Sequence, residues 1–333
     1  MGFYQAMQLS AANLKPLIKN AESKETKNKY IAALILKSIL CLLFCTIVVI
    51  SLLNFRFSNL DFKVRQAALT IVGIFGVLSI SPYIASISNP FLGFIINFIS
   101  IIGILILTCH NVRLCNHSIL VLSYFLLYGY KVENTEILIN RIIGLIFGGI
   151  LVASIFYIKQ RKIEFKNTFI DIINDVDFNT ERTKWQLKFA FVTTSAIMIG
   201  EFLHIPRVMW IGIACMSVFH PDKSQLQIRY KQRMLYMVLG CLMYMSIYFL
   251  IPQQFRGLIG LIGGVMIGFS GTYKWQTVFN AFGALSAATP ILGFGGAIIF
   301  RILNNVFGAL YSKGFDYIIN FIDNKEFANV NEA

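Results

Sequence analysis

Two arginines inside long apolar segments are the residues of this chain best suited to bind an anion. Arg141 begins the segment Arg-Ile-Ile-Gly-Leu-Ile-Phe-Gly-Gly, and Arg301 begins Arg-Ile-Leu-Asn-Asn-Val-Phe-Gly-Ala. An arginine at the centre of a membrane-spanning helix costs about 2.5 to 3.5 kcal/mol, so it persists where water, a carboxylate or an anionic ligand meets its guanidinium. Because the pattern occurs twice, 160 residues apart, it indicates a duplicated site and favours transport.

Amides and glycines share a helix face with these arginines. At helical spacing Arg301 is followed by Asn304, Asn305 and Gly308. A guanidinium pairs bidentately with a carboxylate, and amides add further donors. The alternative is that both arginines extend to the membrane surface, while the glycines only bring helices together. The glycines on the corresponding face of the first segment are Gly144 and Gly148.

The composition places the whole chain in a membrane. Of 333 residues, 56% are hydrophobic and 14% are charged, whereas about 25% are charged in soluble domains. The predicted fold is an all-α polytopic transmembrane bundle of about 11 to 12 helices, arranged as two parallel repeats. The net charge of +13 raises nucleic acid as a partner, but no loop is long enough for a binding domain. Neither an ATPase motif nor a zinc-type or nucleophile pattern is present, so we predict no enzyme, metal or cofactor.

Charge and hydropathy divide the chain into five parts. Basic residues concentrate in three segments that the positive-inside rule assigns to the cytoplasm, so both termini are expected there. The apolar stretch 67–109, interrupted by Pro82 and Pro90, is expected to include short half-membrane helices. The five parts are a cytoplasmic basic tail (1–30), transmembrane repeat 1 (31–158), a cytoplasmic amphipathic helical connector (159–186), transmembrane repeat 2 (187–313) and a cytoplasmic C-terminal tail (314–333).

Lys37 and Lys188 lie in the first turns of corresponding spanning segments. Two lysines at the inner ends of helices would attract anions to a transport pathway. The alternative is that they fix the helices at the membrane surface.

Glu201, His204 and Arg207 follow one another at a spacing of three. A carboxylate and an imidazole near a membrane surface can relay protons, as a proton-driven exporter requires, so Glu201 and His204 are candidate proton-coupling residues. The alternative is an ion-pair cluster that caps a helix.

The chain resembles the fusaric acid resistance protein-like (FUSC), or aromatic acid exporter, family. The resemblance lies in the two R-x6-G helices (Arg141 to Gly148, Arg301 to Gly308) and in the aromatic segment from Tyr273-Lys274-Trp275 through Phe282-Gly283-Ala284-Leu285. It implies proton-driven efflux of aromatic carboxylic acids across a bacterial inner membrane. Plant malate-conducting anion channels are distantly similar.

Together these patterns predict a homodimeric or larger homo-oligomeric carrier in the lipid bilayer that exports organic anions. Arg141 and Arg301 would bind the carboxylate, while Asn304 and Asn305 would add amide donors. Tyr273 and Trp275 would flank the ring of an aromatic substrate. A passive anion channel and a structural membrane scaffold remain alternatives.

Overall fold

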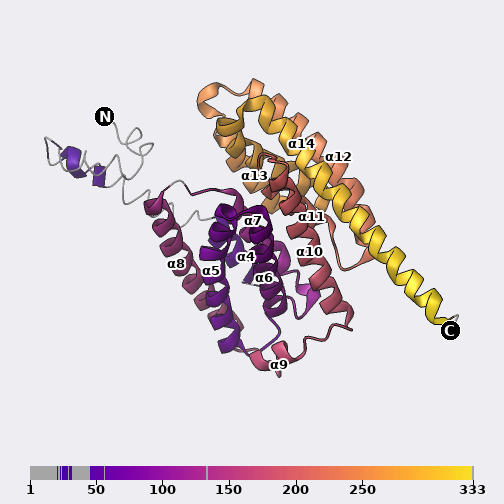
Figure 1. Cartoon of the computed structure of the whole chain (residues 1–333). Helices are drawn as coiled ribbons and strands as arrows, with labels where there is room; N and C mark the ends of the chain where they lie inside the picture. Colours follow the sequence, from indigo (N-terminus) through magenta and orange to yellow (C-terminus); the bar gives the residue numbers. More distant parts are fainter. Residues whose placement is uncertain are drawn as a thin grey trace.

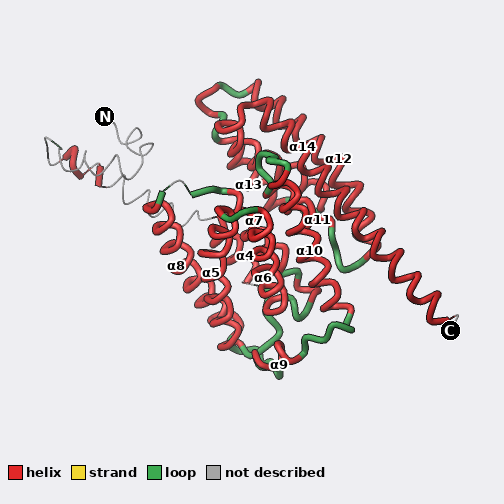
Figure 2. Tube along the Cα trace, in the orientation of Figure 1, coloured by secondary structure: helices red, strands yellow, loops and turns green. Residues whose placement is uncertain are grey.

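Helices are the regular elements of the described part of the chain (Figure 1, Figure 2). The computed structural model describes residues 21, 23, 25–28, 30–31, 46–55, 57–132 and 134–331. Its helices confirm the predicted all-α membrane bundle.

The first half contains α4 (Thr46–Phe55), α5 (Val64–Ile87), α6 (Pro90–Thr108), a 3-10 turn (Val112–Leu114), α7 (His117–Gly129) and α8 (Thr135–Gln160). The short helix α9 (Phe169–Asn174) leads to the second half. That half contains α10 (Glu181–Phe202), α11 (Met209–Val218), α12 (Lys223–Leu250), a second 3-10 turn (Gln253–Phe255), α13 (Leu258–Phe269) and α14 (Tyr273–Asn331).

Short polar side chains start several of these helices by accepting a hydrogen bond from an otherwise unpaired backbone N–H. Asn89 accepts from Leu92 and precedes Pro90, whose fixed φ suits the first helical position. Asn134 starts α8 and Thr180 starts α10 in the same way.

The expectation of half-membrane helices within 67–109 is wrong. α5 runs through Pro82 without ending, and α6 begins at Pro90 after a two-residue turn. Gly93 lets the two helices approach closely, because a Cβ there would lie 3.0 Å from the carbonyl oxygen of Ala85. Two full-length antiparallel helices therefore occupy this stretch.

Loops from both halves meet at the end of the bundle that carries α9, which we call the α9 end. The backbone N–H of Lys63 donates to the Asn167 carbonyl at 2.9 Å. The Gln186 amide donates to the Cys109 carbonyl at 3.1 Å, which joins the start of α10 to the end of α6. The opposite end holds the loops 130–134 and 203–208, where Arg207 approaches the Gly129 carbonyl.

α14 consists of two helices that meet at Gly293, whose φ of 71° is a left-handed conformation that suits glycine. Lys274 before the break and Lys313 after it both stack on tyrosines near the start of α12, Tyr236 and Tyr230 respectively. Tyr244, further along α12, contacts Phe294 next to the break. α14 therefore doubles back at Gly293.

Five described helices are long and apolar enough to cross a membrane: α5, α6, α8, α12 and α14. α7, α11 and α13 are apolar but have only 10 to 13 residues, which is about 15 to 20 Å of helix against a hydrocarbon core of about 30 Å. The sequence count of about 11 to 12 crossings thus exceeds the number of full-length spans in this part of the chain.

Both arginine helices enter the bundle from the same end. α8 and the second part of α14 run toward the α9 end, so Arg141 and Arg301 each lie near the opposite end. The first described helix, α4, runs beside α8 in the same direction, since Phe55 packs on Phe156 at 6.0 Å and Val48 contacts Gly148. The two arginine helices thus run in the same direction, and the division into two parallel repeats stays a prediction.

The connector differs from its prediction. The helical spacing of its apolar residues predicts one amphipathic helix over 159–186, but only Phe169–Asn174 is helical before α10 begins at Glu181. A capping box of Thr168 and Asp171 stabilises this single turn and a half. The third of the basic segments assigned to the cytoplasm, which ends at Arg233 and is predicted from the sequence to be a loop, belongs to α12, which begins at Lys223.

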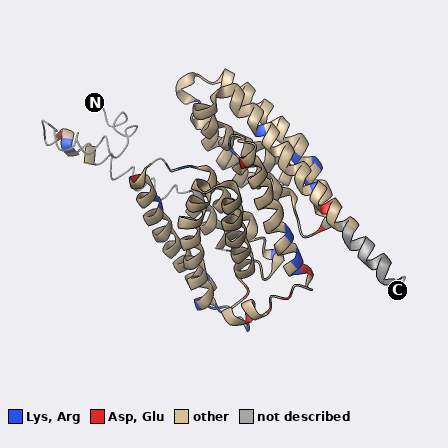
Figure 3. Ribbon diagram, viewed as in Figure 1, with Lys and Arg blue, Asp and Glu red and all other residues tan. Residues whose placement is uncertain are grey.

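Basic side chains gather at the α9 end (Figure 3). They include Lys159 in the last turn of α8, Arg161, Lys162 and Lys166 after it, and Arg229 and Lys231 in α12. By the positive-inside rule this end faces the cytoplasm, which stays a prediction. The N-terminal basic tail and Lys37 lie outside the described residues, apart from a few isolated positions of the tail.

Candidate functional site

Arg301 lies deep between helices of the second half. It follows the break at Gly293 by eight residues, about 12 Å along the helix axis. Its side chain is 1% exposed, and its guanidinium carbon lies 4.9 Å from the centre of the Trp210 ring. The buried Nε atom has no hydrogen-bond partner among the described residues.

A second buried arginine lies on the neighbouring helix. Arg233 of α12 is 2% exposed and donates from Nε and Nη2 to the Asn305 amide oxygen, at 3.0 and 2.7 Å. The Asn305 amide nitrogen donates to the Arg301 carbonyl at 2.7 Å. Asn305 therefore links the two arginines, one through its side chain and the other through its backbone. We call Arg233, Arg301 and Asn305 the arginine site.

The arginine site has no carboxylate partner in the described part of the chain. The ion pairs of Arg182 with Asp175 and of Lys184 with Glu181 lie at the α9 end, away from these two arginines. Two buried cations that repel each other are costly unless an opposite charge or a ligand compensates them. The arrangement is thus poised to accept an anion, which a guanidinium recognises through paired N–H donors.

Asn304 fixes the adjacent loop to the arginine site. Its amide nitrogen donates to the carbonyl oxygens of Pro206 and Arg207, at 2.8 and 3.1 Å. Asn304 is 1% exposed. Of the two asparagines predicted to serve the substrate, Asn305 contacts the arginines directly, and Asn304 holds the loop between α10 and α11.

Arg141 has a different environment from Arg301. Its guanidinium donates to the carbonyl oxygens of Leu127 and Tyr130, at 2.7 and 3.1 Å. These are carbonyls at the C-terminal end of α7, where a cation stabilises the helix. Arg141 is therefore engaged with backbone of the first half and does not join the arginine site.

Tyr130 forms the contact between Arg141 and the second half. The Arg207 guanidinium carbon lies 5.7 Å from the centre of the Tyr130 ring, and Arg207 itself adopts a left-handed φ of 58°. The Arg207 Nη2 atom is buried without a partner among the described residues. A third cation thus lies between the arginine site and the end opposite α9.

Glu201 and His204 lie near this end and share a backbone hydrogen bond of 3.0 Å, but their side chains are not paired in the described structure. The Tyr128 hydroxyl donates to a Glu201 carboxylate oxygen at 2.9 Å. His204 is exposed and has a φ of 51°. Glu201 therefore contacts the first half through Tyr128, and the expected relay of two neighbouring groups is not assembled in this conformation.

The predicted aromatic residues lie at the α9 end, apart from Arg301. The Tyr273 hydroxyl donates to Ser217 at 3.1 Å, and the Arg229 guanidinium lies 5.2 Å from the centre of its ring. Trp275 is 47% exposed and stacks on Phe279. Trp210, which the sequence did not single out, is the aromatic ring next to Arg301.

Further cations stack on tyrosines where α12 and α14 approach the α9 end. Lys313 lies 4.5 Å from the Tyr230 ring centre and Lys274 lies 5.8 Å from that of Tyr236. Together with Arg229 they form a group of three cations on the α9 side of the arginine site. Lys188, the other predicted cation at this end, is half-buried in α10.

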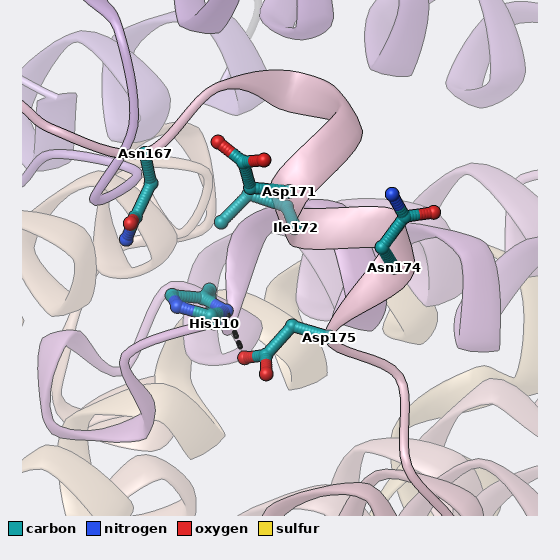
Figure 4. Close-up of a pocket in the computed structure, with 6 residues that line it drawn as sticks. All are labelled: His110, Asn167, Asp171, Ile172, Asn174 and Asp175. Atoms are coloured by element: carbon teal, nitrogen blue, oxygen red, sulfur yellow. Dashed lines mark ion pairs between the residues drawn. The ribbon is translucent and has the colours of Figure 1, made fainter.

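The α9 end also carries a polar cavity of about 360 Å³, built from the first half, the connector and α9 (Figure 4). His110 points toward Asp175, 3.7 Å away, and accepts a hydrogen bond at Nδ1 from Arg182 at 3.1 Å. Because a guanidinium only donates, this contact requires an unprotonated Nδ1. Burial, and then the Arg182 charge, lower the pKa of His110 from its usual 6.5. Groups that could hold a metal ion are not found among the described residues.

Sequence reasoning missed Arg233, although a signal was present. Arg233 was counted with the basic segment because three other cations, Lys223, Arg229 and Lys231, precede it closely. It nevertheless shares a helical stripe with Leu226, Met237 and Tyr244, all of which are buried. Leu226 lies seven residues before Arg233, and Met237 and Tyr244 lie four and eleven residues after it. These spacings place all four on one helix face, so the sequence indicates that Arg233 is buried.

Comparison with known proteins supports the resemblance read from the sequence. Residues 195–312 match the family model described as "Fusaric acid resistance protein-like". The matched region contains Trp210 and the whole arginine site. No curated protein and no solved structure matches the chain. With the apolar helices, the family match supports a multi-pass membrane protein with a role in transport.

Proposed function

From a second half that resembles the fusaric acid resistance family, we propose that this protein exports organic carboxylate anions through the arginine site. The observation that carries the proposal is the burial of Arg233 and Arg301 without a carboxylate partner in the described residues. A carboxylate cargo would compensate both charges and provide acceptors for the remaining guanidinium N–H groups.

The cations of the second half outline a route for the anion. Arg229, Lys274 and Lys313 at the α9 end would attract the anion from the cytoplasm, with Lys188 and Lys37 contributing to the same field. The anion would then meet the arginine site and leave past Arg207 toward the opposite end. Each step would exchange one guanidinium or ammonium for the next, so that the anion is never fully desolvated without a partner.

The family description supports an aromatic carboxylate as cargo, because fusaric acid is an aromatic carboxylic acid. Trp210 lies beside Arg301 and offers a flat apolar surface there. In this proposal Tyr273 and Trp275 contact the substrate only at the cytoplasmic entrance, where they lie, and Arg141 supports the fold of the first half.

Export against a gradient requires an energy source, and we propose proton coupling through Glu201. Its carboxylate accepts from Tyr128 across the boundary between the two halves. Protonation of Glu201 would weaken this charge-assisted contact and alter how the halves meet. His204, exposed three residues further on, would deliver or receive the proton. Homodimer formation in a bacterial inner membrane is proposed on the family resemblance alone.

The test is transport of radiolabelled benzoate by purified protein in liposomes. We expect saturable uptake that responds to an imposed pH gradient. Arg233→Gln and Arg301→Gln should each lower uptake at least about tenfold, since a hydrogen bond to a charged group contributes about 1.5 to 3 kcal/mol. Both variants remove an uncompensated buried charge, so they are expected to fold.

Arg113→Gln is the matched control, because Arg113 is exposed at the α9 end. It should retain uptake. Ohmic benzoate currents that do not depend on the pH gradient would show that the protein is a passive channel and not a carrier. If wild-type protein neither binds nor moves benzoate or other carboxylates, the transport proposal fails and a scaffold role gains support.

A further inference from the structure

The Asn305 side chain lies between two arginines and uses both ends of its amide. Its oxygen accepts from Nε and Nη2 of Arg233, at 3.0 and 2.7 Å. Its nitrogen donates to the Arg301 backbone carbonyl at 2.7 Å. The orientation of the amide is fixed by chemistry, since a guanidinium only donates and a carbonyl only accepts. Asn305 is 2% exposed, so water does not substitute for these contacts freely.

A carboxylate is the usual partner of a buried arginine, because it neutralises the charge and accepts two hydrogen bonds. An amide oxygen accepts the same hydrogen bonds without adding a negative charge. The position therefore orients Arg233 while both guanidinium charges stay uncompensated. A purely structural arginine would gain from aspartate here, whereas an anion-binding arginine would lose its ligand to it.

We propose that Asn305 is a positioning residue that holds Arg233 beside Arg301 with a neutral acceptor, reserving both charges for a carboxylate cargo. This inference rests on the proposed function. It extends that function by assigning the residue that orients Arg233 without neutralising it. Arg233 keeps its Nη1 donors for the cargo, and Arg301 offers the N–H groups of a guanidinium that lies over the Trp210 ring.

The decisive variant is Asn305→Asp, which changes one atom and adds an internal anion next to Arg233. Close to two guanidinium groups the introduced carboxyl stays ionised. It should pair with Arg233 and compete with the cargo, so that the apparent affinity for benzoate falls at least about tenfold. Benzoate should raise the melting temperature of wild-type protein by mass action, and this shift should disappear in the variant.

Melting temperatures without benzoate separate a positioning role from a purely structural one. Asn305→Asp loses the donor to the Arg301 carbonyl, but it gains a charge between two guanidinium groups. If the arginines lack only a counter-charge, this gain outweighs the loss, and the variant should melt at or above the wild-type temperature. Asn304→Asp is the matched control: it adds the same charge one residue earlier, where the amide nitrogen donates to the carbonyls of Pro206 and Arg207. In Asn304→Asp a carboxylate oxygen would face these two carbonyl oxygens, and none of the three atoms can donate a hydrogen bond. This variant should therefore melt at a lower temperature than wild type.

Trp210 provides a direct measure of binding. The chain has three tryptophans, so Trp185→Phe together with Trp275→Phe leaves Trp210 as the single reporter beside Arg301. Titration of sodium benzoate at constant ionic strength should change its fluorescence with an affinity that Asn305→Asp weakens. If that variant does not accumulate, Asn305→Ser keeps the side chain neutral but cannot make both contacts, and should bind benzoate several-fold more weakly.

The outcomes distinguish this inference from the proposed function. A wild-type protein that gives no benzoate response overturns the proposed function, and the inference with it. A wild-type response that persists at full affinity in Asn305→Asp or Asn305→Ser overturns the role of Asn305 alone. Loss of affinity together with retained melting temperature supports both.

Discussion

Arg301 and Trp210 form a cation–π pair, with the guanidinium carbon 4.9 Å from the centre of the indole ring. Both side chains are 1% exposed and come from different helices, α14 and α11. A desolvated pair of this kind is worth about 2 kcal/mol. The indole thus supports the cation on its face, leaving the N–H edge available for an anion.

Replacing Trp210 should therefore weaken anion binding as well as the fold. Trp210→Leu should lower the free energy of unfolding by about 3 kcal/mol, from lost packing and the lost cation–π contact. Trp210→Phe keeps an aromatic face and should lose less. Denaturant unfolding in detergent and equilibrium benzoate binding measure the two effects. Equal benzoate affinities for the Phe and Leu variants would show that the ring face does not position Arg301.

Arg141→Gln should affect stability rather than affinity. Arg141 donates to the Leu127 and Tyr130 carbonyls at the end of α7, so the variant leaves those acceptors without a cation. We expect the free energy of unfolding to fall by about 1 to 3 kcal/mol. Benzoate affinity should stay within about twofold of wild type, in contrast to Arg301→Gln. A tenfold loss of benzoate affinity would show that Arg141 contributes to the binding site.

Gly308 is required for the close contact of α14 with α11. A Cβ at this position would lie 2.6 Å from the Ile211 carbonyl oxygen and 2.8 Å from the Ala214 side chain. Gly308→Ala should therefore lower the free energy of unfolding by about 1 to 3 kcal/mol by forcing the helices apart. Because Arg301 and Trp210 lie on these two helices, their spacing should change too.

Gly314, on the same helix, is the matched control. A Cβ there meets no atom within 4 Å, so Gly314→Ala should be neutral or stabilise by about 0.5 to 1 kcal/mol through helix propensity. Thermal unfolding of the two variants in the same detergent compares them. Similar melting temperatures for both would contradict a packing role for Gly308.

Hydropathy and charge predicted the elements that depend on local pattern. The membrane class and the helix around Arg141 follow from runs of apolar residues. The sequence did not reveal that Arg141 caps α7 while Arg301 stacks on Trp210, because the two arginines sit in equivalent local patterns. Their partners are set by loops far away in the chain.

Long-range packing also explains the two misassigned segments. The apolar residues of the connector recur at helical spacing, but they contact other elements without forming one helix. Phe169, for example, donates its backbone N–H to Gln66 and packs its ring near Phe62. The cluster of positive charges around Arg233 favoured a loop. Its burial depends on a contact with Asn305, which lies 72 residues away in the chain.

The junction at the α9 end should lose stability as the pH falls through the range in which histidine titrates. The pKa of His110 is lowered in the folded protein by burial and by Arg182, so the folded state favours the neutral ring. Burial and Arg229 likewise lower the pKa of His220. A lowered histidine pKa contributes stability that is complete above about 6.5, the unfolded value, and is lost as the pH falls below it.

Melting temperatures measured between about pH 7.5 and 5.5 should therefore decline in wild-type protein. His110→Gln keeps an acceptor for Arg182 but cannot take up a proton, so its decline should be shallower. In the double variant with His220→Gln the decline should be shallower still, because neither position can then take up a proton on unfolding. A single variant whose melting temperature falls as steeply as that of the wild type would show that the Arg182–His110 contact does not hold the ring neutral.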